Sequence, residues 1–259
     1  MWWIVTLAVV AILLAAVGMV IGPFLTLRRL PERADINGMV LIRDGMVSAG
    51  LVPFGEREVA LVDAGNDAEA KAILTELSRH GLGPEDVKVI LLTHSDSDHI
   101  AGIPKFPNAQ VMALAAEVNQ EERSSPGGVP MVRPRFGKRE GIRLSRTLQD
   151  GEVVQLGPFS ARVFAVPGHT PGSAAYAIGE NLFLGDSANQ DKHGQLEASL
   201  WIFTKSRVQN RKSLVELAHR LSGDSSIKTL VFGHSAPLER GIAPLAEFAA
   251  KHSTAPNPS

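Results

Sequence analysis

The 259-residue sequence predicts a mixed α/β (α+β) fold in one large domain, preceded by an apolar N-terminal helix. Three observations lead to this prediction. The chain opens with a long run of apolar residues, strand-like and helix-like stretches then alternate, and several of the strand-like stretches end in histidine or aspartate. About 230 residues follow the apolar run, which is enough chain to bury the core of a single large domain.

The first element is the apolar run, which extends from Trp2 to Gly22 and contains one polar residue, Thr6. A helix of about 21 residues is roughly 32 Å long, which is enough to cross the hydrocarbon core of a membrane. A secretory signal peptide is the alternative, but the run lacks the basic start and the small-residue cleavage site of such peptides. We therefore expect a transmembrane anchor over residues 1–27 and a linker over residues 28–36.

Positive charge lies on the C-terminal side of the apolar run, at Arg28, Arg29 and Arg33. The positive-inside tendency would leave the following domain in the cytoplasm. The sequence thus predicts a single-pass membrane protein that contacts the membrane through its N-terminal helix, with the main domain on the cytoplasmic side.

Hairpins and a helix are expected next. Residues 39–65 contain short apolar runs that are separated at RDG and FGER, which is typical of antiparallel strands. A helix should follow over residues 67–81, because its apolar residues keep the spacing of one buried helical face and Gly81 can cap its C-terminus. These apolar residues are Ala70, Ile73, Leu74 and Leu77.

Further strands and a second helix complete the predicted domain. A buried strand is expected at VKVILLTH, and four more at GEVVQLG, SARVFAVPGH, SAAYAIG and NLFLGD. An amphipathic helix follows, with Leu214, Leu217 and Leu221 on one face, and the strand KTLVFGH comes after it. We expect the domain to span residues 37–250 and residues 251–259 to form a disordered tail.

Composition limits the chemistry of any site. The chain has no cysteine, so a metal ion must be bound by histidine, aspartate or glutamate. The formal net charge of −1 gives no sign of the concentrated lysine and arginine on which binding to phosphate backbones depends. We therefore expect a small-molecule substrate and no nucleic acid as partner, and the oligomeric state stays open.

Histidine and aspartate gather where the predicted strands end. Three strands stop at His94, Asp186 and His234, and a fourth stops at His169. Such endings bring side chains to one edge of a sheet, where one site could collect them. The first ending carries the densest cluster, which consists of His94, Asp96, Asp98 and His99. A single histidine at a strand end is more commonly structural, whereas the joint pattern indicates a metal site.

Five short motifs follow one another along the domain: LVDAG, THSDSDHIAG, PGHTPGS, FLGDS and VFGHS. In this order they resemble the metal-binding motifs of the metallo-β-lactamase-fold hydrolases, and the resemblance covers about residues 37–250. The forms GHTPGS and GD are closest to the glyoxalase II-like and lactonase-like branches. Asp63, in LVDAG, resembles an early strand end of the family, and we expect it to support the ligands from behind.

The resemblance implies an αββα sandwich of two mixed sheets flanked by helices, with two divalent metal ions at one edge. Zinc is the expected metal, with Fe²⁺ and Mn²⁺ as alternatives. The implied ligands are His94, Asp96 and His169 for the first ion, Asp98, His99 and His234 for the second, and Asp186 as a bridge. A hydroxide between two cations is a strong nucleophile at neutral pH, because coordination lowers the pKa of water from about 15.7 to about 7.

One implied ligand departs from the family's usual set, because Asp96 stands where a second histidine is expected. Asp96, Asp98 and Asp186 together carry −3, and a bridging hydroxide brings the sum to −4, which neutralises two divalent cations. A histidine in place of Asp96 would leave +1. The additional carboxylate should therefore weaken the Lewis acid, raise the pKa of bound water and favour harder metals such as Mn²⁺ or Fe²⁺.

Three classes of function fit these motifs. The preferred class is a metal-dependent hydrolase that uses a metal-bound hydroxide on a carbonyl ester, thioester or lactone, with Asp98 or a metal-bound water handling the proton. The second class is a metal-dependent phosphodiesterase or nuclease, which the H-x-D-x-D-H form alone suggests. The third is a diiron redox or sensing protein, although no electron-supplying domain follows.

Candidate substrate contacts lie in the loops. Asn189 and His193 follow Asp186 closely, where we expect a substrate pocket. The basic stretch at residues 133–143 could cover the site, although a solvated loop is the simpler interpretation. Substrate identity depends on the shapes of such loops, which composition does not predict.

Overall fold

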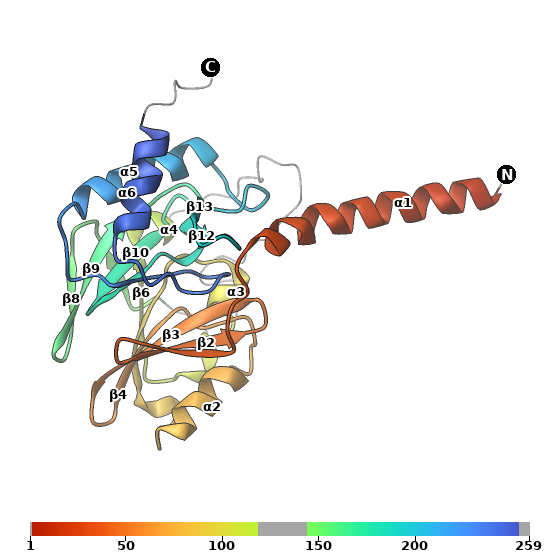
Figure 1. Cartoon of the computed structure of the whole chain (residues 1–259). Helices are drawn as coiled ribbons and strands as arrows, with labels where there is room; N and C mark the ends of the chain where they lie inside the picture. The colour runs from red at the N-terminus through yellow and green to blue at the C-terminus, as the bar shows by residue number, and fades with distance from the viewer. Residues whose placement is uncertain (1, 119–143, 254–259) are drawn as a thin grey trace.

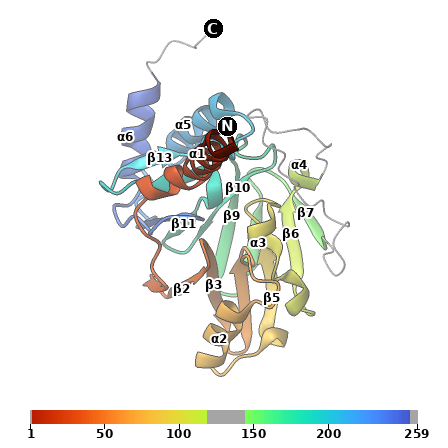
Figure 2. The same cartoon turned by 90° about the vertical axis from the view of Figure 1, so that its right-hand side faces the viewer.

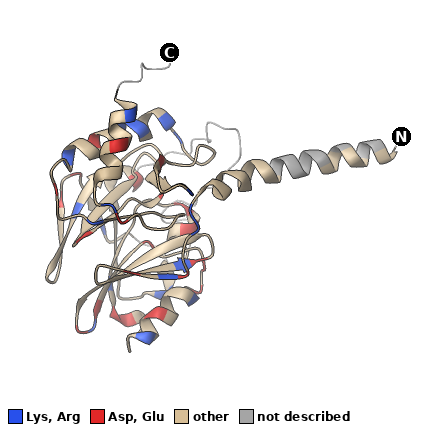
Figure 3. Cartoon of the chain, in the orientation of Figure 1, with Lys and Arg blue, Asp and Glu red and all other residues tan. Residues whose placement is uncertain are grey.

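The computed structural model describes residues 2–118 and 144–253. One long helix, α1 (Trp2–Ile21), projects from a layered domain (Figure 1). Charged residues of both signs are spread over the domain (Figure 3). The basic stretch expected at residues 133–143 and the last part of the expected tail, residues 254–259, lie outside the described residues.

The first sheet has seven strands that lie in chain order. They are β1 (Arg33–Ile36), β2 (Met39–Asp44), β3 (Val47–Gly55), β4 (Glu58–Val62), β5 (Val87–Leu91), β6 (Gln110–Leu114) and β7 (Arg146–Leu148). The antiparallel pairing of β2, β3 and β4 confirms the predicted hairpins, while β4 to β7 run parallel. β1 lies within the residues expected as a linker. Its turn to β2 uses Asn37 and Gly38 at φ of 49° and 79°, the left-handed values that a two-residue hairpin turn requires.

The second sheet has five strands in the order β14-β11-β10-β9-β8. They are β8 (Val153–Leu156), β9 (Phe159–Ala165), β10 (Ala174–Ile178), β11 (Asn181–Phe183) and β14 (Thr229–Val231). All five were predicted from the sequence. β14 runs parallel to β11, and the remaining pairs are antiparallel. A separate two-stranded ribbon consists of β12 (Ala188–Gln190) and β13 (Leu196–Ala198).

Both predicted amphipathic helices are present. α2 (Lys71–Arg79) ends before Gly81, whose φ of 69° is left-handed, as expected of a glycine that ends a helix. α5 (Arg207–Arg220) buries Leu214 and Leu217. The described part of the chain has seven further helical segments: α3 (Ser97–Ile100), α4 (Ala115–Val118), α6 (Ala243–His252) and the 3₁₀ turns η1 (Gly22–Thr26), η2 (Pro84–Asp86), η3 (Ile103–Lys105) and η4 (Gly185–Ser187).

Three apolar cores separate four layers in the order helix, sheet, sheet, helix. In β2, Met39 and Leu41 lie in the core between the sheets, whereas Val40 and Ile42 lie in the core beneath α2. This alternation follows from the two-residue period of a strand. A third core joins the second sheet to α5 and α6, so α2 and α5 cover opposite outer faces (Figures 1 and 2). The implied αββα sandwich is therefore present.

The predicted membrane anchor is wrong. Among the residues that the structure describes, no helix has both the length and the apolar character that are needed to cross a membrane. The length of the apolar run predicts a membrane span over all of its residues, but the end of the run belongs to the domain. Val20 and Ile21, together with the following Phe24, line a cavity that His234 also lines. The single-pass localisation, the cytoplasmic placement and the membrane contact, which rested on this anchor, are corrected with it.

Candidate metal centre

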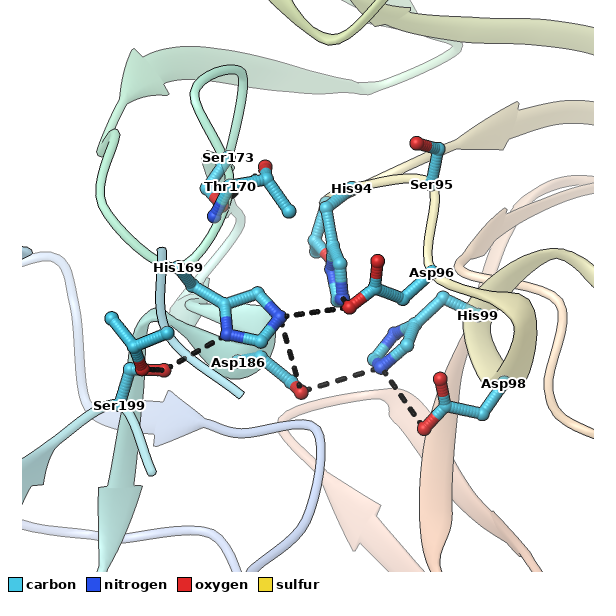
Figure 4. Close-up of polar contacts among 12 residues, drawn as sticks. His94, Ser95, Asp96, Asp98, His99, His169, Thr170, Ser173, Asp186 and Ser199 are labelled. Atoms are coloured by element: carbon cyan, nitrogen blue, oxygen red, sulfur yellow. Dashed lines mark hydrogen bonds and ion pairs between the residues drawn. The ribbon is translucent and has the colours of Figure 1, made fainter. Parts of the chain in front are cut away.

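The candidate centre lies where strands of both sheets end. One residue of the centre follows shortly after the end of each of four strands, which are β5, β9, β11 and β14, and α3 carries two further residues of the centre. Side chains from these separate loops point toward one another (Figure 4). The residues that the fold brings together are His94, Asp96, Asp98, His99, His169, Asp186 and His234, the seven predicted from the sequence.

Three sets of three described residues within this cluster each offer ligand atoms that lie within 4.8 Å of one another, and one of them, His94, His99 and Asp186, shares a histidine with each of the other two. The first set is His94, Asp96 and His169, and the second is Asp98, His99 and His234. In the first set, Asp96 Oδ2 lies 3.2 Å from His169 Nε2 and 3.6 Å from His94 Nε2. In the second set, Asp98 Oδ2 lies 3.4 Å from His234 Nε2 and 3.8 Å from His99 Nε2.

Asp186 lies between the two sets. Its Oδ2 atom lies 3.0 Å from His234 Nε2 and 3.7 Å from His169 Nε2, and its Oδ1 atom lies 3.3 Å from His99 Nε2. One carboxylate therefore reaches histidines of both sets. The packing is also close at Gly233, because a Cβ atom added to this glycine would lie only 2.1 Å from Asp186 Oδ1.

Each of the four histidines turns its Nε2 atom into the cluster and its Nδ1 atom toward a neighbouring oxygen. The Nδ1 atom of His94 lies 3.0 Å from Thr93 Oγ1, and that of His99 lies 2.8 Å from Asp63 Oδ2. The Nδ1 atom of His169 lies 3.0 Å from Ser199 Oγ, and that of His234 lies 2.7 Å from the Met46 carbonyl oxygen. A carboxylate or carbonyl oxygen can only accept, so the proton lies on Nδ1 in at least His99 and His234. The Nε2 lone pairs are then free to bind a metal ion.

The electrostatics of the centre favour a cation at its middle. His94 Nε2, His99 Nε2 and Asp186 Oδ1 are buried without a hydrogen-bond partner among the described residues. Burial lowers the pKa of His99, but the charges of Asp186, Asp63 and Asp98 outweigh burial and raise this pKa well above its usual value. The imidazole of His99 is therefore stabilised as a cation, and the same carboxylates would attract divalent ions, so such ions fit the donor set and would balance its carboxylates.

Asp63 supports the centre from behind. It follows β4, and its side chain accepts hydrogen bonds from the backbone N–H of Thr93 at 2.8 Å and from the Thr93 hydroxyl at 2.8 Å, in addition to its contact with His99. Because the Thr93 hydroxyl donates to Asp63, its oxygen can accept the Nδ1 proton of His94. One buried carboxylate thereby orients a histidine of each set.

Glu117, at the end of α4, is a buried residue of the site that no sequence motif marks. Its carboxylate accepts hydrogen bonds from the backbone and hydroxyl of Ser95 at 2.8 and 2.6 Å, from the Thr170 hydroxyl at 2.7 Å and from the Gly172 N–H at 3.2 Å. Ser95 stands between two residues of the first set, and Thr170 follows the third. Glu117 therefore joins the loops that carry the whole first set.

The two predicted substrate contacts are in different environments. His193 is exposed and lines a cavity of about 630 Å³ together with Ser199, which contacts His169. Asn189 is buried, and its Oδ1 atom has no hydrogen-bond partner within residues 2–118 and 144–253. Their contact with substrate stays a prediction.

A four-layer αββα sandwich with a histidine and aspartate cluster at one edge is the arrangement that the sequence resemblance implied. The chain belongs to the metallo-beta-lactamase superfamily, whose family profile matches residues 42–234. The expected superfamily is thus confirmed, and curated relatives support its glyoxalase II-like branch.

Two of these curated relatives are hydroxyacylglutathione hydrolases from Pectobacterium carotovorum and Aliivibrio salmonicida. Each is 32% identical to the chain, over 138 and 141 residues, which are 51% and 53% of this chain. The matched regions cover 43% and 45% of the relatives, so the similarity spans less than half of their length.

Solved structures show the same fold. A metallo-beta-lactamase family protein from Thermus thermophilus is 26% identical with a TM-score of 0.61, covering 85% of this chain and 81% of that chain. A subclass B3 metallo-beta-lactamase of Bradyrhizobium japonicum is 18% identical with a TM-score of 0.60, covering 88% of this chain and 93% of that chain. At this lower identity the likeness concerns the fold alone.

Proposed function

We propose that the protein is a metal-dependent hydrolase that acts on a carbonyl ester, thioester or lactone. The observation that carries this proposal is the convergence of four imidazole Nε2 atoms and three carboxylates in one cluster beside two cavities. The names of the curated relatives, which state hydrolysis of an acyl-glutathione, support acyl transfer to water as the reaction class.

His94, Asp96 and His169 would hold one divalent ion, and Asp98, His99 and His234 would hold the other, with Asp186 shared between them. Two such ions, with zinc as the first expectation, would supply an activated water and would polarise the substrate carbonyl. The Nδ1 contacts of the four histidines fix their rings before any ligand binds, so the site needs little rearrangement.

Asp98 is the residue that we assign to proton handling. Its side chain is 33% exposed, whereas those of Asp96 and Asp186 are 9% and 11% exposed. A carboxylate that water can reach exchanges protons with the solvent more readily than a buried one. Asp98 can therefore take the proton of the attacking water at the carboxylate oxygen that does not hold the ion and pass it to the leaving group.

The test uses the purified chain, its metal content and a panel of esters, thioesters, lactones and phosphodiesters. We expect close to two equivalents of transition metal and activity on the acyl substrates. His94→Ala and Asp186→Ala should lower both metal content and activity, whereas His219→Ala, on α5, is the matched control and should change neither. Full activity in metal-free protein would refute the mechanism, and activity on phosphodiesters alone would favour the second class of function.

A further inference from the structure

The end of α1 and the turn η1 form one wall of a cavity beside the candidate metal centre. The cavity has a volume of about 240 Å³, and Asp98 and His234 are its charged or ionisable lining residues. Its apolar lining consists of Val20, Ile21, Phe24, Met46 and Val47, and Asn66 is its remaining polar residue. A largely apolar pocket that adjoins reactive groups is the usual form of a small-molecule site.

The N-terminal wall of this cavity is held against the domain. The ring of Phe24 stands edge-on to His234 at 5.3 Å and lies 5.7 Å from the ring of Phe203. The backbone on the C-terminal side of η1 is paired to the β12–β13 ribbon, because the Arg28 N–H donates to the Gln190 carbonyl and the Lys192 N–H donates to the Thr26 carbonyl, both at 3.0 Å. Phe24 is therefore part of the site.

The same turn separates two cavities that differ in charge. Gly22 and Thr26 line the larger cavity of about 630 Å³, in which Lys192, Arg207 and Arg211 provide positive charge and Asp191 and Glu197 provide negative charge. Among the residues that the structure describes, the lining of the smaller cavity contains no lysine or arginine. A charged or polar part of a ligand would lose its solvation in the smaller cavity without finding a cationic partner, whereas an apolar chain loses nothing.

We propose that the smaller cavity binds an apolar acyl chain of the substrate, with Val20, Ile21 and Phe24 as the residues that determine chain-length specificity. This inference rests on the proposed hydrolase function and names its substrate class, an ester, thioester or lactone with an aliphatic acyl group. The carbonyl carbon would lie next to Asp98 and His234, and the chain would extend along the wall that α1 and η1 provide.

The kinetic test compares p-nitrophenyl acetate, butanoate and hexanoate as substrates of the full chain. Burial of each additional methylene should raise kcat/KM by about fourfold until the cavity is filled. Ile21→Asn should lower the hexanoate-to-acetate ratio of kcat/KM by about tenfold or more. Met19→Asn, on the same helix but outside the lining, is its matched control and should keep the ratio. Phe24→Ala should likewise lower this ratio, and Leu25→Ala, outside the lining, is its matched control and should keep the ratio.

A binding test separates this inference from the proposed function. Neutral 1-alkanols from ethanol to hexanol need no metal ion, and their dissociation constants can be measured by ligand-observed NMR. Alkanol affinity that rises with chain length and is lost in Ile21→Asn would support binding of an apolar chain in the smaller cavity. If this result is obtained and none of the esters is hydrolysed, the proposed hydrolase function fails but the inference about the cavity stands. Esters that are hydrolysed without any dependence on chain length or Ile21, or a flat alkanol series, would overturn the inference.

Discussion

At the scale of single residues, one ring nitrogen of each histidine is fixed by a neighbouring oxygen before any ion binds. The partners come from the residue that precedes His94, from the residue that follows β4, from the loop after β13 and from the β2–β3 turn. In His99 and His234, whose partners can only accept, the fixed Nδ1 proton leaves the Nε2 lone pair directed inward, and the contact also raises the basicity of the ring as a ligand. The centre is therefore defined by pairs of residues, a ligand and its support, rather than by ligands alone.

Asp96 is the residue on which the choice of metal should depend. Its carboxylate lies among the histidines of the first set, and their hydrogen bonds and positive charges outweigh burial and hold its pKa well below the usual value. A carboxylate donates more charge to a cation than an imidazole does, which favours harder ions. We expect Asp96→His to bind Zn²⁺ more tightly and Mn²⁺ more weakly, and the rise of activity with pH to move to lower pH.

Chelator competition measures these affinities, and kcat/KM from pH 5 to pH 10 measures the profile. Asp96→Ala separates the charge effect from the geometry of the longer imidazole, because it removes the carboxylate without adding a ligand. Unchanged metal affinity and an unchanged pH profile in Asp96→Ala would place Asp96 outside the ligand set and would refute the charge argument.

At the scale of elements, the two sheets are joined across the centre by a residue of α4. Ser95 follows β5 of the first sheet, and Thr170 precedes β10 of the second, and Glu117 accepts hydrogen bonds from both. The Ala174 N–H also donates to the Thr93 carbonyl at 2.8 Å, so Glu117 adds side-chain contacts to a direct backbone contact between the two layers. Glu117 thus relates the positions of His94 and Asp96 to that of His169.

We expect Glu117→Gln to loosen the first set of residues. In glutamine, an NH₂ group replaces one of the two carboxylate oxygens. The buried donors that bind this oxygen, either those of Ser95 or those of Thr170 and Gly172, would lose their acceptor, which lowers the free energy of unfolding by about 1–3 kcal/mol. Metal affinity should fall by about 10- to 100-fold at the first ion. Urea unfolding and chelator competition measure the two effects. Glu216→Gln, an exposed residue of α5, is the control, and equal metal affinities in the two variants would contradict a positioning role.

Local periodicity explains which elements could be predicted. β2 to β4 are short apolar runs that are separated by turn residues, and α2 and α5 keep the 3.6-residue spacing of one buried face, so their sequences indicate them directly. The supporting contacts of the centre have no such pattern, because Glu117 lies 22 residues from Ser95 and Met46 lies 188 residues from His234. At the N-terminus, a clear local pattern predicts the wrong environment. The apolar composition of the run is typical of a membrane span, whereas Ile21 and the following Phe24 line a cavity of the domain.

At the scale of the whole molecule, the fold can be divided into three apolar cores and one polar edge. The cores are built from regular elements and need no ion for their stability. The edge gathers carboxylates and imidazoles from both sheets, and the described ion pairs of Asp98 and Asp186 are all with histidines. Coulomb repulsion among the carboxylates should therefore open this edge first when no cation is present.

Removal of the metals should destabilise the edge while the cores remain folded. A ligand that binds only the native state stabilises it by about 2.7 kcal/mol at a free concentration of one hundred times its Kd. We therefore expect a chelator to lower the Tm of the metal-loaded chain, and hydrogen exchange to accelerate in the loops around His94, His169, Asp186 and His234 before it accelerates in β2, β3 or α5. Asp186→Ala should have a lower Tm that no longer responds to chelator, because both ions lose a shared ligand. His219→Ala should respond as the unmodified chain does. A Tm that chelator leaves unchanged, in a chain shown to contain metal beforehand, would mean that the ions do not join the two sheets.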